Sequence, residues 1–268
     1  MTGESESKSA TAGLDGVPAA PALRHDELTA MRPWGYLATL AWAVVAFLVG
    51  QFAALALVLL LRPGSVNTLL TTAYDGELIT LFILISNPIT IAVLVLAARL
   101  ARADAAAYLA LQWSSTRYVA WSIVVLIALI AAGDALLFLG GRDLVTPFQL
   151  ESYTTAAAEG WLPAMFVAAV VVAPAGEEVL FRGFLYRGLV RSERSAWPGI
   201  VAISLLWAGL HIQYDWAGIL QIFVIGLFLG FVRWRSGSVL LTFLLHALFN
   251  LEGTMETVLQ VQYHIYGG

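Results

Sequence analysis

The chain has 268 residues, of which 60% are hydrophobic and only 12% are charged. Soluble domains carry roughly 25% charged residues, so the composition indicates an integral membrane protein and excludes an ordinary soluble domain. The net charge of −4 gives no sign of a nucleic-acid partner, and the absence of cysteine excludes disulfides, thiolate metal ligands and a cysteine nucleophile.

Residues 1–33 differ in composition from the rest of the chain. They are rich in Ser, Ala, Gly and Pro, carry charges of both signs and contain no apolar core. The lack of an apolar core excludes a secretory signal peptide, and so polar a segment cannot bury enough surface to offset the entropy of ordering. The sequence therefore predicts a disordered cytoplasmic tail, with a docking role as an alternative, followed by an integral membrane domain over residues 34–268.

Seven apolar runs in this domain are long enough, or nearly long enough, to cross a bilayer as helices. They lie at residues 34–61, 78–98, 118–140, 161–181, 199–213, 216–232 and 238–252. The fifth and seventh runs are short and need neighbouring helices to cover the polar backbone at their ends. The predicted fold is therefore an all-α, polytopic transmembrane helix bundle of about seven spans.

Basic residues alternate between the predicted loops. Twelve of the fourteen Lys and Arg residues precede the first span or follow the second, fourth or sixth span, and only Arg62 and Arg142 fall on the other side. The positive-inside rule then places the N-terminus in the cytoplasm and the C-terminus outside. The Ala-rich composition and the short chain suggest a bacterial cytoplasmic membrane.

Three of the predicted spans contain polar residues that a bilayer normally excludes. An ionisable side chain at mid-bilayer costs about 2.5–3.5 kcal/mol on insertion scales, so such residues usually pair or mark a functional site. With a rise of about 1.5 Å per residue, His246 lies about 12 Å, His211 about 18 Å and Glu177 about 15 Å from the cytoplasmic ends of their spans. The residues that we single out in or directly next to these three spans are Glu177, Glu178, Arg182, Trp207, His211, His246 and Asn250.

Helical spacing decides which of these side chains share a face. Glu178 and Arg182 are four residues apart and lie on one face, where they can neutralise each other. Glu177 points about 100° away from Glu178, which leaves it free to meet another helix. His246 and Asn250 are also four residues apart, so the imidazole and the carboxamide can reach the same substrate atom.

This set of groups suits peptide hydrolysis by an activated water. Glu177 would act as general base, and His211 would orient the water or share in proton transfer, with Trp207 walling the site or positioning that ring. His246 and Asn250 would donate hydrogen bonds to the oxyanion, a role in which one lost donor typically costs about 10²–10³ in rate. Alternatively, Glu177, His211 and His246 could bind Zn²⁺ with a water in an open position.

Three motifs, EExxxR, [F/W]xxxH and HxxxN, occur in this order, with 34 residues from Glu177 to His211 and 35 residues from His211 to His246. In this order and spacing they resemble the CAAX-protease and bacteriocin-processing (CPBP, or Abi) family of intramembrane peptidases. That family includes the type II CAAX prenyl endopeptidases. The resemblance covers about residues 160–252, which we take as the predicted peptidase core.

The resemblance implies an intramembrane endopeptidase of the glutamate or metallo type. It assigns the water-activating and oxyanion roles to the same four residues as the chemistry above, gives Glu178 and Arg182 a supporting role, and leaves Zn²⁺ dependence open. Trp207 stands where Phe is commoner, a departure that affects pocket shape. The implied substrate is a membrane-associated protein or peptide, lipidated or not, cleaved near a C-terminus that enters from the cytoplasmic side.

Two other classes of function are alternatives. The same centre could serve a non-proteolytic scaffold, or an immunity or regulatory protein that binds a partner. Buried Glu and His also suit proton-coupled transport, but the chain shows no clear internal repeat and its ionisable groups cluster in the C-terminal half. Rival intramembrane proteases do not fit, because HExxH and GxSxG motifs are missing and Asp134, read as a structural or solvated acid, has no partner aspartate within a span.

Overall fold

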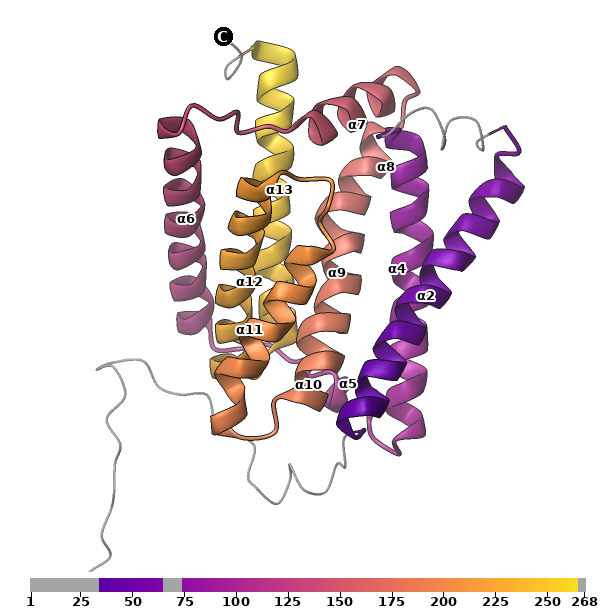
Figure 1. Cartoon of the computed structure of the whole chain (residues 1–268), viewed down its shortest axis with the longest axis vertical. Coiled ribbons are helices and arrows are strands. Elements are labelled where there is room, and N and C mark those ends of the chain that lie inside the picture. Colours follow the sequence, from indigo (N-terminus) through magenta and orange to yellow (C-terminus); the bar gives the residue numbers. More distant parts are fainter. Residues whose placement is uncertain (1–33, 65–73, 265–268) are drawn as a thin grey trace, which may run out of the picture.

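The computed structural model describes residues 34–64 and 74–264, and this part of the chain is helical with no strand. The predicted tail at residues 1–33 lies outside the described residues. Seven helical segments run alongside one another as a bundle (Figure 1). They are α2 (Tyr36–Leu61), α4 (Gly76–Leu100), α6 (Thr116–Leu139), the continuous segment Leu162–Leu189, α11 (Glu193–Gly209), α12 (Trp216–Ser236) and α13 (Val239–Tyr263).

Five of these segments are long and apolar enough to cross a membrane: α2, α4, α6, the segment Leu162–Leu189 and α12. The other two predicted spans correspond to α11 and α13, which are not among the five. α11 has 17 residues, and the second half of α13 carries Glu252 and Glu256. The all-helical membrane bundle is therefore confirmed, whereas the seven-span count and the cytoplasmic N-terminus stay predictions.

Two short helices cover the ends of the bundle. α5 (Ala105–Tyr108) follows α4 at one end, and α7 (Pro147–Ala158) lies across the other end (Figure 1). Thr146 and Gln149 form a capping box that fixes the start of α7. The α7 residue Thr155 accepts a hydrogen bond of 2.8 Å from the backbone N–H of Gly76, at the beginning of α4. α7 therefore ties α4 to the end of the bundle at which α6 finishes.

The turn between α12 and α13 is only two residues long and is set by its sequence. Gly237 ends α12 with φ +67°, a left-handed conformation that glycine adopts without steric cost. Ser238 then caps α13 by accepting a hydrogen bond of 3.0 Å from the N–H of Leu241. This tight turn holds α13 against α12 and so fixes the position of His246, two turns further along.

The segment Leu162–Leu189 is not a uniform α-helix. It consists of α8 (Leu162–Val167), the π-helical segment Ala168–Val172, α9 (Ala173–Glu178), a second π-helical segment Val179–Leu185 and α10 (Tyr186–Leu189). π-helical turns are rare and frequently occur at functional sites. Glu177 and Glu178 lie in the short α-helical stretch between the two π segments.

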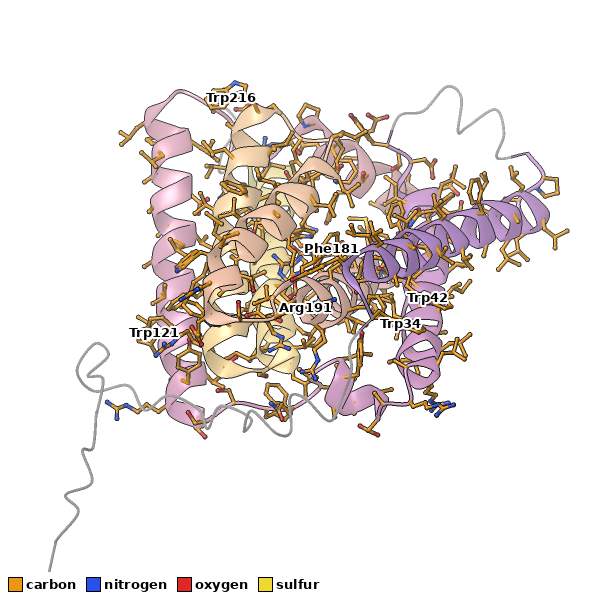
Figure 2. The ribbon with its side chains drawn as sticks, turned by 60° about the horizontal axis from the view of Figure 1, so that its bottom comes forward. Trp34, Trp42, Trp121, Phe181, Arg191 and Trp216 are labelled. Atoms are coloured by element: carbon orange, nitrogen blue, oxygen red, sulfur yellow. The ribbon has the colours of Figure 1, made fainter. Side chains whose placement is uncertain are left out.

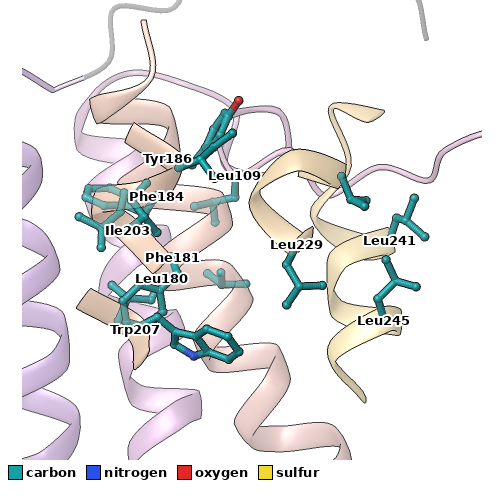
Figure 3. Close-up of a cluster of buried hydrophobic side chains, with 14 of the residues drawn as sticks. Leu109, Leu180, Phe181, Phe184, Tyr186, Ile203, Trp207, Leu229, Leu241 and Leu245 are labelled. Atoms are coloured by element: carbon teal, nitrogen blue, oxygen red, sulfur yellow. The ribbon is translucent and has the colours of Figure 1, made fainter. Parts of the chain in front are cut away.

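The tightly packed core lies toward the end of the bundle where α5 is found. Apolar side chains from Val179–Leu185 meet residues of α11, α12 and α13 there (Figure 3). At the same end, Arg191 Nη2 donates a hydrogen bond of 2.6 Å to the carbonyl of Trp34, whereas Trp216 lies at the far end (Figure 2). The fully buried members of this core include Phe184, Leu185, Leu229, Leu241 and Leu245.

Candidate active site

The three motifs meet inside the bundle. Trp207 Nε1 on α11 donates a hydrogen bond of 2.6 Å to Glu177 Oε2 on α9. His246 Nε2 on α13 lies 4.0 Å from the same carboxylate oxygen. The side chain of Glu177 is 27% exposed, although His246 is almost fully buried. A carboxylate and an imidazole therefore face each other with one side open to a cavity.

Glu178 lies in a different environment from its neighbour. Its side chain is fully buried, and its Oε1 accepts hydrogen bonds of 2.9 Å from Arg182 Nη1 and 2.9 Å from His246 Nδ1. The predicted ion pair between Glu178 and Arg182 is present. Because the carboxylate accepts at Nδ1 of His246, the ring is held with Nε2 directed toward Glu177.

His211 lies just beyond the end of α11 rather than inside a helix. The sequence predicts a span through residue 213, but α11 ends at Gly209 and His211 sits in the turn that follows. Its Nδ1 is 2.8 Å from the carbonyl oxygen of Trp207. Because a carbonyl only accepts, Nδ1 carries the hydrogen and Nε2 is free to accept from a water or a substrate.

Asn250 lines the same cavity, four residues after His246. Its Nδ2 donates a hydrogen bond of 2.8 Å to the carbonyl oxygen of Ala169, in the first π-helical segment. One amide hydrogen is therefore engaged, and the second is available to another acceptor.

Trp207 is the centre around which the other groups are arranged. It is 1% exposed, and the guanidinium of Arg182 stacks over its ring at 4.3 Å. Both imidazoles meet the indole edge to face, with centroids 5.3 Å away for His211 and 5.1 Å for His246. The sequence suggested only that this residue shapes the pocket or positions His211. The structure adds the N–H bond to Glu177, which Phe at this position could not supply.

A cavity of about 270 Å³ rises from these residues toward the end of the bundle covered by α7. Glu177, Trp207, His211 and His246 lie at its inner end. The Tyr214 ring lies near both His211 and Phe148 on its wall, and burial raises the pKa of Tyr214 to about 12. Tyr214 is therefore a neutral hydrogen-bond donor throughout the physiological range.

The cavity wall also holds a group of three acids that the motifs did not reveal. Carboxylate oxygens of Asp134, Glu252 and Glu256 lie within 4.8 Å of one another. Gln221 Nε2 donates a hydrogen bond of 3.3 Å to Asp134. The sequence motifs drew attention to Asp134 alone among these three acids. Glu252 and Glu256 are four residues apart and so share a helix face, and this spacing was the signal in the sequence that could have identified them as a pair.

The Zn²⁺ alternative finds partial support in the geometry. Both imidazoles use Nδ1 for a fixed partner and keep Nε2 free, as metal-binding histidines do. However, among the described residues only the three acids bring three ligand atoms within 4.8 Å of one another. Glu177, His211 and His246 do not form such a group, so the observed arrangement does not fit a three-ligand zinc site.

Comparisons with known proteins agree with the motifs. Residues 159–251 match the family described as type II CAAX prenyl endopeptidase Rce1-like, and the predicted resemblance is thereby confirmed for this segment. The chain is also similar to an uncharacterized 24.3 kDa protein of Escherichia coli, with 38% identity over 79 residues. That similarity covers 28% of this chain and 36% of the relative's length. No solved structure matches. The family match and the five long apolar helices identify an integral membrane protein.

Proposed function

We propose that the protein is an intramembrane endopeptidase in which Glu177 and His211 activate a water for attack on a peptide bond. The observation that carries this proposal is the pairing of Glu177 with His246 across 4.0 Å at the inner end of a membrane-embedded cavity. The match of this segment to an endopeptidase family supports it. A general base must lie within reach of the proton that it abstracts, and this cavity leaves room for a water beside Glu177.

In this mechanism Glu177 Oε2 takes a proton from the water while the oxygen attacks the carbonyl carbon of the substrate. His211 accepts a hydrogen bond from the same water through Nε2 and so orients it. The protonated Glu177 then gives its proton to the amide nitrogen, the C–N bond breaks, and a carboxylic acid and an amine are released. Trp207 holds the carboxylate in place through its N–H.

His246 and Asn250 stabilise the negative charge that develops on the carbonyl oxygen. Donation by His246 requires a hydrogen on Nε2 while Nδ1–H remains bonded to Glu178, so the ring is doubly protonated at that step. The buried Glu178 supplies the balancing negative charge, and Arg182 holds this carboxylate in turn. Asn250 contributes its second amide hydrogen. Preorganised donors of this kind are worth about 10²–10³ in rate each.

The substrate is proposed to be a peptide or protein that reaches the membrane-embedded cavity, with a lipid group as an optional feature. The glutamate-type mechanism is favoured over the metallo type because the three zinc ligands are not gathered. Treatment with a chelator distinguishes the glutamate-type mechanism from the metallo-type mechanism. Cleavage that survives dialysis against a strong chelator fits the glutamate type, whereas loss of cleavage that is restored by Zn²⁺ would assign the metallo type.

The test of the activity is cleavage of a quenched peptide library by the purified protein in detergent. We expect Glu177→Gln, which keeps the shape of the side chain, to lower the rate by about 10²–10⁴, the range for loss of a general base. Glu193→Gln is the matched control, because Glu193 is an exposed residue at the start of α11, outside the cavity. Cleavage by Glu177→Gln at the wild-type rate would exclude the mechanism and favour a non-proteolytic scaffold.

A further inference from the structure

Most arginines of the described chain gather at one end of the bundle. Hydrogen bonds tie the loops of that end together, including Trp34 Nε1 to the carbonyl of Ala97 at 3.0 Å and Gln112 Nε2 to the carbonyl of Gly237 at 3.2 Å. The opposite end of the described chain carries Arg62 and Arg142. The arginines of the first end are Arg99, Arg102, Arg117, Arg187, Arg191, Arg194, Arg233 and Arg235. Short loops rich in arginine stay in the cytoplasm, so this end is assigned to the cytoplasmic face.

The cavity reaches the surface at the opposite end. Its outer wall comes from the connection between α6 and α7 and from the connection between α11 and α12. Asp143 and Asp215 on these connections are exposed to solvent and line the cavity, and an ion pair joins Asp215 to Arg142 beside it. These connections lie next to α7, at the end with few arginines (Figure 1), so the mouth of the cavity is at that end.

Toward the arginine-rich end the cavity is closed by packed side chains. Arg182 is 1% exposed and donates to the carbonyl of Gly226, and Arg233 Nε in turn donates to the carbonyl of Arg182 at 2.8 Å. Phe184 and Leu241 belong to the hydrophobic core at this end and are fully buried (Figure 3). Among the described residues, none from the loops of the arginine-rich end lines the cavity.

We propose that the reacting groups are reached from the non-cytoplasmic side of the membrane. The substrate class is then a peptide segment that lies outside the cytoplasm, either secreted or belonging to the outer side of a membrane protein. This inference rests on the proposed peptidase function for its substrate, but not for the side of access. It also means that two sequence predictions exclude each other: with a cytoplasmic N-terminus, the cavity does not open to the cytoplasm.

Thiol accessibility tests the side of access without any enzyme activity. The natural chain has no cysteine, so single cysteines report single positions. Glu177→Cys places a thiol at the inner end of the cavity, and Thr254→Cys places one on its wall. Each variant is treated with a small, membrane-impermeant, positively charged methanethiosulfonate in right-side-out and in inside-out membrane vesicles. We expect modification at both positions to be at least about tenfold faster in right-side-out vesicles.

Two control cysteines report the sidedness of the vesicles. Ala157→Cys is exposed on α7 at the end of the mouth but outside the cavity, and Ala106→Cys is exposed on α5 at the arginine-rich end. They should react from opposite sides. Faster modification of Glu177→Cys and Thr254→Cys in inside-out vesicles would overturn the proposal. If access is from the outside but the peptide library is not cleaved, the peptidase function fails and the side of access stands.

Discussion

The bundle has a tightly packed half and a half that surrounds the cavity, and the two halves meet between Glu177 and Glu178. The different surroundings of these two adjacent side chains reflect the difference between the halves. The side chain of Glu177 is 27% exposed and faces a cavity, whereas that of Glu178 is fully buried and bonded on one oxygen to Arg182 and His246. Below them, side chains fill the space between helices. Above them, polar and apolar side chains together surround a void of about 270 Å³. This difference fits the proposed roles, in which the buried carboxylate with fixed partners holds the site in place and the partly exposed one reacts.

The first prediction tests the packing difference with a matched pair of substitutions. Leu241→Ala, in the packed half, should lower the free energy of unfolding by about 2–5 kcal/mol, because the buried side chain leaves a void behind. Leu137→Ala removes the same atoms from the cavity wall, where the side chain is only partly buried, and should cost about 1 kcal/mol or less. Chemical denaturation in detergent measures both values. Equal losses would mean that the two halves are packed alike.

The second prediction concerns Trp207, which lies at the boundary of the two halves. Trp207→Phe keeps an aromatic side chain but removes the pyrrole part of the indole with the N–H that bonds Glu177. A hydrogen bond to a charged group is worth about 1.5–3 kcal/mol, so kcat should fall by about 10- to 100-fold while KM changes little. The peptide library with single-turnover rates measures the effect. Trp197→Phe is the control, since Trp197 is half exposed and outside the cavity. An unchanged kcat for Trp207→Phe would show that the residue acts through packing and not through its N–H.

The third prediction concerns the mouth and has the smallest effect. The backbone N–H of Gly218, followed by the charge of Arg142, lowers the pKa of Asp215 below its ordinary value of 3.8. A depressed pKa stabilises the fold above pH 3.8, and this contribution disappears as the pH falls through the folded-state pKa. Asp215→Asn keeps the helix cap and removes the charge, so its melting temperature should lie slightly below wild type at pH 7.

The difference in melting temperature between wild type and Asp215→Asn should then shrink in acid, as Asp215 becomes protonated in the natural chain. Scanning both proteins in detergent at neutral and acidic pH checks this. A gap of constant size at every pH would show that the cap geometry, and not the charge of Asp215, is responsible.

Much of the fold could be predicted from the sequence because hydrophobic runs are a strong local signal. Each of the seven predicted apolar runs falls on a helical segment. The predicted span that corresponds to α11 continues to residue 213, because Leu210 and Ile212 are apolar. The helix in fact ends at Gly209, and the chain then turns toward Asp215, which caps α12. Hydropathy alone misplaces the boundary, because apolar residues also occur in the turn that follows the helix.

The sequence indicated which residues to expect in the candidate site, but not which of them contact each other. Motif order indicated the seven residues, and the four-residue spacing gave the ion pair of Glu178 with Arg182. No local pattern tells that Glu178 also fixes His246, that Trp207 bonds Glu177, or that Asp134 joins two acids of α13. Those contacts depend on how helices distant in the sequence rotate against each other. The side on which the cavity opens is likewise a property of the packed bundle.

The two π-helical segments that flank Glu177 and Glu178 have a consequence for insertions and deletions. A π-helical turn holds one residue more than an α-helical turn, and each residue of an α-helix advances about 100° around the axis. Removing one residue from Ala168–Val172 would therefore leave every side chain of the site chemically intact and relax the turn to an α-helix. Met165 and the residues before it would keep nearly their present direction relative to Glu177, because the wider π turn already accommodates the extra residue. The deletion would act instead on the backbone of the π turn, where the carbonyl of Ala169 accepts the hydrogen bond from Asn250 Nδ2.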